Sequence, residues 1–183
     1  MKKFLLAIAI IFPLTAIAQN EEGKKETKFE QFSSSIGSIV KFYDYKLPII
    51  KARAQNVNQS VRKVIRENES SCFLNLSFTP YQRNEHSAFI YLEDLIELKK
   101  ATEELKSLAE IDATGSANYL ENKFRTSDGA YIGYYIDKNR DGDKEPVWYF
   151  NIDGYSYGTI FFKTADEIIA IFDGAIQKIN EIK

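Results

Sequence analysis

The sequence predicts an α+β protein built from antiparallel sheet and two amphipathic helices. Short segments rich in β-branched and aromatic residues recur along the chain between turn residues, as antiparallel strands do. Two longer segments carry apolar residues at helical spacing. Strands precede a helix in both halves, 37–110 and 117–183, which suggests a duplicated ββββα unit. Since many amphipathic helices align equally well, a single unrepeated domain is the alternative.

The N-terminus has the pattern of a secretory signal peptide. Residues 1–3 are Met-Lys-Lys, residues 4–18 carry no charge, and the Ala-Ile-Ala at 16–18 suits signal peptidase. An uncleaved membrane anchor would need about 20 apolar residues, and this segment is shorter and contains Pro13. The predicted organisation is a signal peptide at 1–18, a flexible leader at 19–28 and a single α+β domain at 29–183. We therefore expect an exported protein, periplasmic or secreted, with no membrane span in the mature chain.

The first half is predicted to begin with a short helix or turn docked through Phe29 or Phe32. Pro48 lacks an amide donor and indicates a break or a sheet edge. Residues 57–65 fit a short amphipathic helix as well as a strand. Further strands are expected at 39–45, 72–78 and 88–91.

The first long helix is expected over 93–110. Its buried stripe is predicted to contain Leu95, Leu98, Thr102, Leu105 and Leu108. Four strands are expected in the second half, at 119–126, 130–136, 147–152 and 159–162. The last helix should begin at Thr164, whose hydroxyl forms a capping box with Glu167. Because neither half buries much apolar surface alone, the halves should share one core.

This order of strands and helices over 37–183 resembles the Whirly and PUR-type folds. Those families bind single-stranded nucleic acid on basic and aromatic sheet faces. The resemblance implies the fold, and no functional residue is carried over. After signal removal the chain has 22 basic and 26 acidic residues, and nucleic-acid binding favours an excess of basic residues. Export argues against nucleic acid as well.

Catalytic motifs are sparse. Cys72 alternates with Leu74, Leu76 and Phe78, the pattern of a buried strand face, so a structural thiol is favoured over a reactive one. His86 is the single histidine, which excludes histidine-cluster metal sites. Paired carboxylates remain an alternative route to acid–base chemistry. The sequence therefore favours a binding protein over an enzyme.

The sharpest local motif is the segment 137–145, which matches the D-x-N-x-D-G start of a calcium loop. Position 12 of an EF-hand would be a glutamate and is Trp148 here, so an EF-hand is excluded. The flanking segments are strand-like, which leaves two interpretations: a calcium-bearing hairpin loop or an ordinary turn. The predicted Ca²⁺ ligands are Asp137, Asn139, Asp141 and Asp143.

Aromatic residues are dense between 131 and 162, and some must face outward because only alternate strand residues face a core. Exposed tyrosine and tryptophan suit recognition of a glycan, peptide or protein, although tyrosine is also a common strand residue. The predicted ligand-binding residues are Tyr131, Tyr135, Trp148, Tyr155 and Tyr157.

The hypothesis favoured by the sequence is an exported, soluble binding or interaction module, stabilised by calcium if the 137–143 loop takes the ion. One alternative is an exported carboxylate-dependent hydrolase that acts on glycans. The other is a structural component of the cell envelope.

Overall fold

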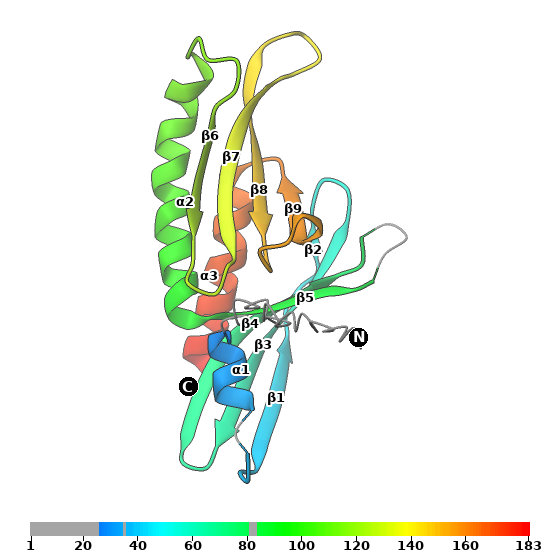
Figure 1. The fold of residues 1–183 in the computed structure, drawn as a ribbon, viewed down its shortest axis with the longest axis vertical. Coiled ribbons are helices and arrows are strands. Elements are labelled where there is room, and N and C mark those ends of the chain that lie inside the picture. Colours follow the sequence, from blue (N-terminus) through cyan, green and yellow to red (C-terminus); the bar gives the residue numbers. More distant parts are fainter. Residues whose placement is uncertain (1–25, 35, 81–83) are drawn as a thin grey trace, which may run out of the picture.

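The computed structural model describes residues 26–34, 36–80 and 84–183. The elements of this part of the chain are α1 (Lys28–Ser33), β1 (Val40–Lys46), β2 (Ile50–Lys51), β3 (Asn56–Arg66), β4 (Glu69–Phe78), β5 (His86–Tyr91), α2 (Leu92–Ala113), β6 (Glu121–Arg125), β7 (Tyr131–Lys138), β8 (Lys144–Asn151), the 3₁₀ turn η1 (Ser156–Gly158), β9 (Thr159–Phe162) and α3 (Ala165–Ile182). The molecule is elongated, with one sheet toward each end of its long axis (Figure 1). The α+β class predicted from the sequence is confirmed.

The first sheet has the strand order β1-β3-β4-β5, and the short strand β2 pairs with β3. All of these pairings are antiparallel. Residues 57–65, for which the sequence allowed helix or strand, lie in β3 because β1 and β4 satisfy the backbone groups on both of its edges. Pro48 lies between β1 and β2, at the break that it predicted.

The second sheet has the order β6-β7-β8-β9, again fully antiparallel. Its four strands correspond to the four that the sequence predicted for this half. Each sheet is followed by a helix: α2 follows β5 and α3 follows β9.

The two halves share one core. Helix α2, which follows the first sheet, packs against β6, β7 and β8 of the second. Helix α3 contacts α2, β9 and also β3 and β4 of the first sheet. One apolar cluster therefore joins residues from both sheets and both helices, including Leu74, Leu98, Phe150 and Phe172. The rings of Phe150 and Phe172 meet edge to face at 5.3 Å.

The prediction for the α2 stripe was wrong at Leu108, which is 47% exposed, whereas Ala109 is buried. At 3.6 residues per turn, the four-residue step from Leu105 to Ala109 stays on the buried face, and Leu108 falls beside it. In α3, Thr164 caps the helix as predicted by accepting a hydrogen bond from the amide of Glu167. The Glu167 carboxylate accepts from the amide of Lys163 rather than from that of Thr164.

Cys72 is a buried free thiol on the same buried strand face as Leu74 and Leu76. Burial raises the pKa of the Cys72 thiol, so the reactive thiolate is disfavoured. This agrees with a structural role for Cys72.

No described helix is both long enough and apolar enough to cross a membrane. The predicted signal peptide and residues 19–25 of the predicted leader lie outside the described residues. Within that leader Thr27 caps α1, and its side chain and that of Glu30 each accept a hydrogen bond from the other residue's backbone amide.

Candidate functional site

Three tyrosines lie together on the side of the second sheet opposite α2 and α3. We call Tyr131, Tyr135 and Tyr149 the tyrosine face. The ring centroids of Tyr131 and Tyr149 are 6.0 Å apart, and those of Tyr135 and Tyr149 are 6.4 Å apart. Alternate residues of β7, such as Ile132 and Tyr134, enter the core instead, as strand geometry requires. Two of the predicted ligand-binding residues, Tyr131 and Tyr135, thus contact the same buried ring, and each remains partly exposed.

Gly133 leaves room for the side chain of Tyr149. Tyr149 is directly opposite Gly133 in the β7–β8 register. Its side chain crosses over Gly133, so a Cβ atom added there would lie only 2.7 Å from the Tyr149 hydroxyl. The hydroxyl then donates a 2.5 Å hydrogen bond to Oε1 of Glu121 on β6. A glycine is therefore needed at 133 for the ring of Tyr149 to lie across the sheet.

Glu121 is held as a carboxylate by several donors. Besides Tyr149, the Tyr119 hydroxyl lies 3.0 Å from Oε2 and the Lys123 ammonium 3.7 Å from it. The hydrogen bond from Tyr149 is the largest of the effects that lower the pKa of Glu121. Burial, followed by this same bond, raises the pKa of Tyr149. The lowered pKa of Glu121 and the raised pKa of Tyr149 keep the carboxylate as the acceptor and the hydroxyl as the donor near neutral pH.

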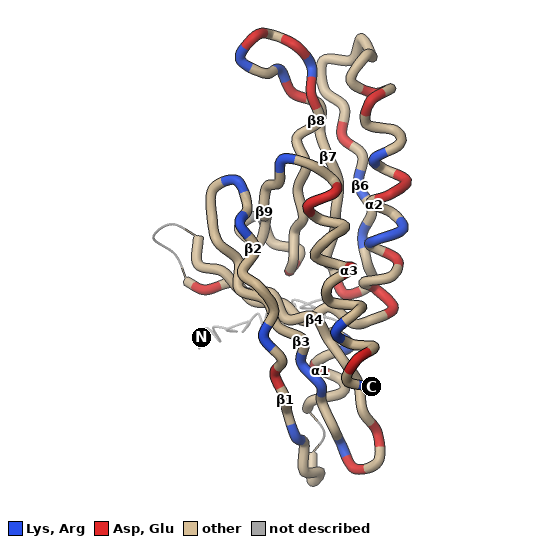
Figure 2. The backbone as a smooth tube through the Cα atoms, turned by 180° about the vertical axis from the view of Figure 1, so that it is seen from behind, with Lys and Arg blue, Asp and Glu red and all other residues tan. Residues whose placement is uncertain are grey.

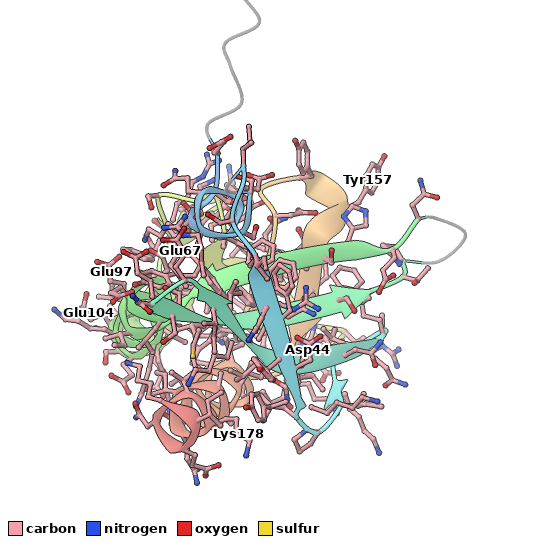
Figure 3. The ribbon with its side chains drawn as sticks, turned by 90° about the horizontal axis from the view of Figure 1, so that it is seen from below. Asp44, Glu67, Glu97, Glu104, Tyr157 and Lys178 are labelled. Carbon is pink, nitrogen blue, oxygen red and sulfur yellow. The ribbon has the colours of Figure 1, made fainter. Side chains whose placement is uncertain are left out.

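The other predicted aromatic residues lie elsewhere. Trp148 is 4% exposed and packs in the core with its ring centroid 4.9 Å from that of Tyr134. Because neighbouring strand residues point to opposite faces, Tyr149 rather than Trp148 belongs to the tyrosine face, although the Tyr149 ring is itself buried, with 4% exposure. Tyr157 is exposed within η1, and Tyr155 is exposed directly before it. Tyr157 and Lys178 of α3 lie on opposite sides of the molecule (Figure 3).

The predicted calcium ligands all lie at the β7–β8 hairpin, where Asp137, Asp141 and Asp143 are exposed. The Asn139 side-chain oxygen accepts hydrogen bonds from the amides of Asp141 and Asp143, at 3.0 and 2.9 Å. Gly142 adopts a φ of 89°, which favours glycine. Within the described ranges, no three His, Cys, Asp or Glu side chains are grouped so that they could hold a metal ion. Calcium binding stays a prediction, and the ion would have to displace both amide donors from Asn139.

A hollow of about 490 Å³ adjoins the tyrosine face at this hairpin. We call it the hairpin hollow. Tyr135 and Val147 line it on the sheet side, and Arg53 reaches it from the first half of the chain. Its other lining residues are Asp137, Lys138, Asn139, Arg140, Asp141 and Glu145. Acidic and basic residues alternate around the hairpin (Figure 2), so an aromatic ring borders a set of hydrogen-bonding groups of both signs.

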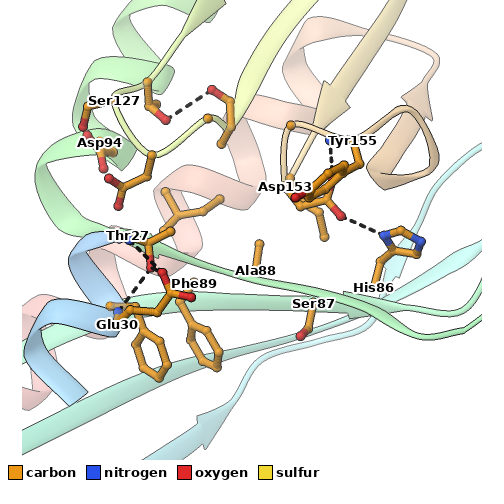
Figure 4. A pocket seen from close by; sticks show the side chains of 18 of the residues that line it. Thr27, Glu30, His86, Ser87, Ala88, Phe89, Asp94, Ser127, Asp153 and Tyr155 are labelled. Carbon is orange, nitrogen blue, oxygen red and sulfur yellow. Dashed lines mark hydrogen bonds and ion pairs between the residues drawn. The ribbon is translucent and has the colours of Figure 1, made fainter. Parts of the chain in front are cut away.

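A larger cleft of about 810 Å³, the junction cleft, lies where the two halves meet (Figure 4). The turns that follow β6 and β8 form its second-half side, and α1 and β5 form the first-half side. His86 Nδ1 lies 2.7 Å from Oδ2 of Asp153 and joins the two halves. Asn151 orders the turn after β8, since its side chain bonds the amide of Gly154 and the carbonyl oxygen of Tyr155. The sequence analysis missed this cleft, although it includes Tyr155.

Two carboxyl groups of the junction cleft are relevant to the alternative prediction of a carboxylate-dependent hydrolase. Asp94 and Asp128 both line the cleft, and burial raises the pKa of Asp94. Both are engaged by Lys28: its ammonium lies 2.7 Å from Asp94 Oδ1, and its amide donates to Asp128 Oδ2 at 2.9 Å. Because an ammonium already holds Asp94 at its buried position, we assign this pair no catalytic role.

A scan against protein-family models found no match for this chain, and a search of curated proteins found none either. The fold and these surfaces alone define the class of protein: an α+β protein with two antiparallel sheets, each followed by a helix, and with an aromatic surface on the second sheet.

Proposed function

We propose that this protein is an exported carbohydrate-binding module whose ligand packs on Tyr135 at the edge of the tyrosine face and enters the hairpin hollow. The observation that carries the proposal is that Tyr135 belongs to both surfaces: it contacts Tyr149 and also lines the hollow. A ligand placed there meets an aromatic face at one side and charged hydrogen-bonding groups at the other.

Sugar chemistry fits this combination. A pyranose ring with equatorial hydroxyl groups has flat, apolar C–H faces that pack on an aromatic ring, while its hydroxyl groups at the edge both donate and accept hydrogen bonds. Tyrosine suits this role because it offers an apolar ring face and a polar tip. Asp141, Glu145 and Arg140 at the hollow supply acceptors and donors, and charge-assisted hydrogen bonds are the stronger kind.

The export part of the proposal rests on the pattern of residues 1–18, which suits a secretory signal. Expression of the full chain in a Gram-negative host should give a periplasmic or secreted protein with Gln19 at its N-terminus. An uncleaved chain retained in the cytoplasm would contradict this part of the proposal and leave carbohydrate binding as a separate question.

Calorimetric titration of the protein with cellotetraose and chitotetraose tests carbohydrate binding, since both present equatorially substituted rings. We expect at least one to bind, and Tyr135→Ala to weaken binding about tenfold, which corresponds to about 1.4 kcal/mol. Tyr43→Ala is the matched control, because Tyr43 is an exposed strand tyrosine in the first sheet. Failure of both oligosaccharides to bind would contradict the proposal, as would equal losses in the two variants.

A further inference from the structure

The junction cleft is distinct from the carbohydrate surface and has a strongly acidic lining. Five carboxylate residues line it among the described residues: Glu30, Glu85, Asp94, Asp128 and Asp153. Arg125 is the lining residue with a permanent positive charge, and its guanidinium lies beside the turns at Gly129 and Gly154. Even with Lys28 counted, carboxylates outnumber cations, so the cleft has a negative potential that attracts cations.

The burial of the Asp94 carboxylate also favours a cation, independently of the number of charges in the lining. Its side chain is only 4% exposed. Lys28 satisfies Oδ1, whereas Oδ2 has no hydrogen-bond partner among the residues that the structure describes. A buried carboxylate oxygen without a donor costs free energy, and a cation in the cleft would offset part of that cost. Lys28 itself demonstrates that an ammonium group is accommodated against this carboxylate.

Asp128 and Glu85 present the more accessible carboxylates of the cleft. Asp128 is half-buried and uses Oδ2 to accept the Lys28 amide hydrogen bond. Glu85 is exposed at the start of β5. Both line the cleft and keep exposed surface, while the nearly buried Asp94 contributes its charge from below the surface.

The lining also contains apolar residues, among them Phe29, Ala88 and Phe89. Phe29 of α1 stacks on Phe89 of β5 with ring centroids 3.7 Å apart. Figure 4 shows Phe89 and Ala88 along β5, between the Thr27–Glu30 side and the His86–Asp153 side. A hydrocarbon body can therefore be buried in the same cleft that attracts a positive charge.

We infer that the junction cleft binds a small organic cation, namely an amine with an apolar body. A bare metal ion fits less well, because the described carboxylates do not form a group of three that could share one ion. An ammonium on a flexible hydrocarbon chain needs no such convergence, since each N–H donates to its own acceptor.

Three five-carbon probes of similar length distinguish binding of a cation, of a neutral chain and of an anion: 1,5-diaminopentane, pentane-1,5-diol and glutarate. We expect calorimetry to detect binding of the diamine and of neither other probe. Binding of the diol as tightly as the diamine would overturn the inference in favour of an apolar site. Binding of glutarate in place of the diamine would overturn it in favour of an anion site centred on Arg125.

Two variants locate the diamine in the cleft. Asp128→Asn keeps an acceptor for the Lys28 amide and removes one charge. Ser87→Lys changes an exposed residue of the lining and adds a competing ammonium. Both should weaken diamine binding at least fivefold, or about 1 kcal/mol. The control, Glu110→Gln, removes one exposed charge from α2 and should leave binding unchanged.

The inference is overturned if the diamine does not bind to the wild-type protein, or if Glu110→Gln weakens binding as much as Asp128→Asn. Ser87→Lys keeps the test informative even if Asp128→Asn proves unstable, since full diamine affinity in a folded Ser87→Lys protein also overturns it. None of these results depends on carbohydrate binding at the tyrosine face.

Discussion

The hydroxyl of Tyr149 reaches across Gly133 to donate a 2.5 Å hydrogen bond to Oε1 of Glu121. This contact links β8 to β6 over the intervening strand β7. It places the ring of Tyr149 against Tyr131 and Tyr135 and thereby builds the surface proposed to bind carbohydrate. Substitution of Gly133 or Glu121 should therefore change the free energy of unfolding in ways that the burial of the residue alone does not predict.

Gly133→Ala should destabilise the protein. The new methyl group would collide with the Tyr149 hydroxyl and with the carbonyl oxygen of Asn122, and overpacking of this kind costs about 1–3 kcal/mol. Gly174→Ala is the matched control in α3, where an added Cβ meets no atom within 4 Å. It should stabilise the protein by about 0.5–1 kcal/mol. Urea unfolding measures both, and equal effects would refute the account of Gly133.

Glu121→Gln should change how stability depends on pH. The pKa of Glu121 is lowered in the folded protein, chiefly by Tyr149. Its stabilising contribution is therefore present above the unfolded pKa of about 4.3 and is lost as pH falls through the folded pKa. The difference in free energy of unfolding between wild type and Glu121→Gln should therefore narrow as the pH falls below the unfolded pKa of about 4.3. A constant difference would show that Glu121 gains nothing from its donors.

His86→Ala should weaken the connection between the two halves. The change removes the 2.7 Å contact with Asp153, in which both side chains are largely buried. We expect a loss of about 1 kcal/mol in the free energy of unfolding. Glu85→Ala, at the adjacent exposed position, should be nearly neutral. If the two variants lose the same stability, the contact contributes nothing specific.

Cys72 should resist thiol reagents in the native protein. Its side chain is buried, and burial raises the pKa of the thiol, so both access and thiolate formation are unfavourable. Labelling with a chromogenic disulfide reagent should proceed only as fast as the protein opens. Rapid labelling under native conditions, at a rate unchanged by added urea, would contradict this placement of Cys72.

Local patterns predicted much of the fold. The amphipathic stripe and Thr164 cap of α3 depend on neighbours within a few residues, as do the turns between the strands of the second half. The choice between helix and strand for β3 did not follow locally, because Val57 and Val61 suit either period and Val64, seven residues after Val57, fits the helical one. Pairing with β1 and β4 decided it. True duplication of the two halves stays a prediction.

The sites were harder to predict, because their partners are distant in sequence. Period-two alternation placed Tyr131 and Tyr135 together, but it could not reveal that Trp148 enters the core while Tyr149 folds across Gly133. His86 and Asp153 are 67 positions apart, and no local signal connects them. The single histidine, two residues before the strand predicted at 88–91, was the one available hint.

The most direct test of the central claim is a titration of the ¹⁵N-labelled protein with the oligosaccharide that binds, followed by amide chemical shifts. The account predicts that the largest changes fall in β7, β8 and the hairpin between them, and at Arg53. Amides of the junction cleft, such as Ala88 and Asp128, should remain unchanged. Changes concentrated in that cleft, or spread evenly over the protein, would contradict carbohydrate binding at the tyrosine face.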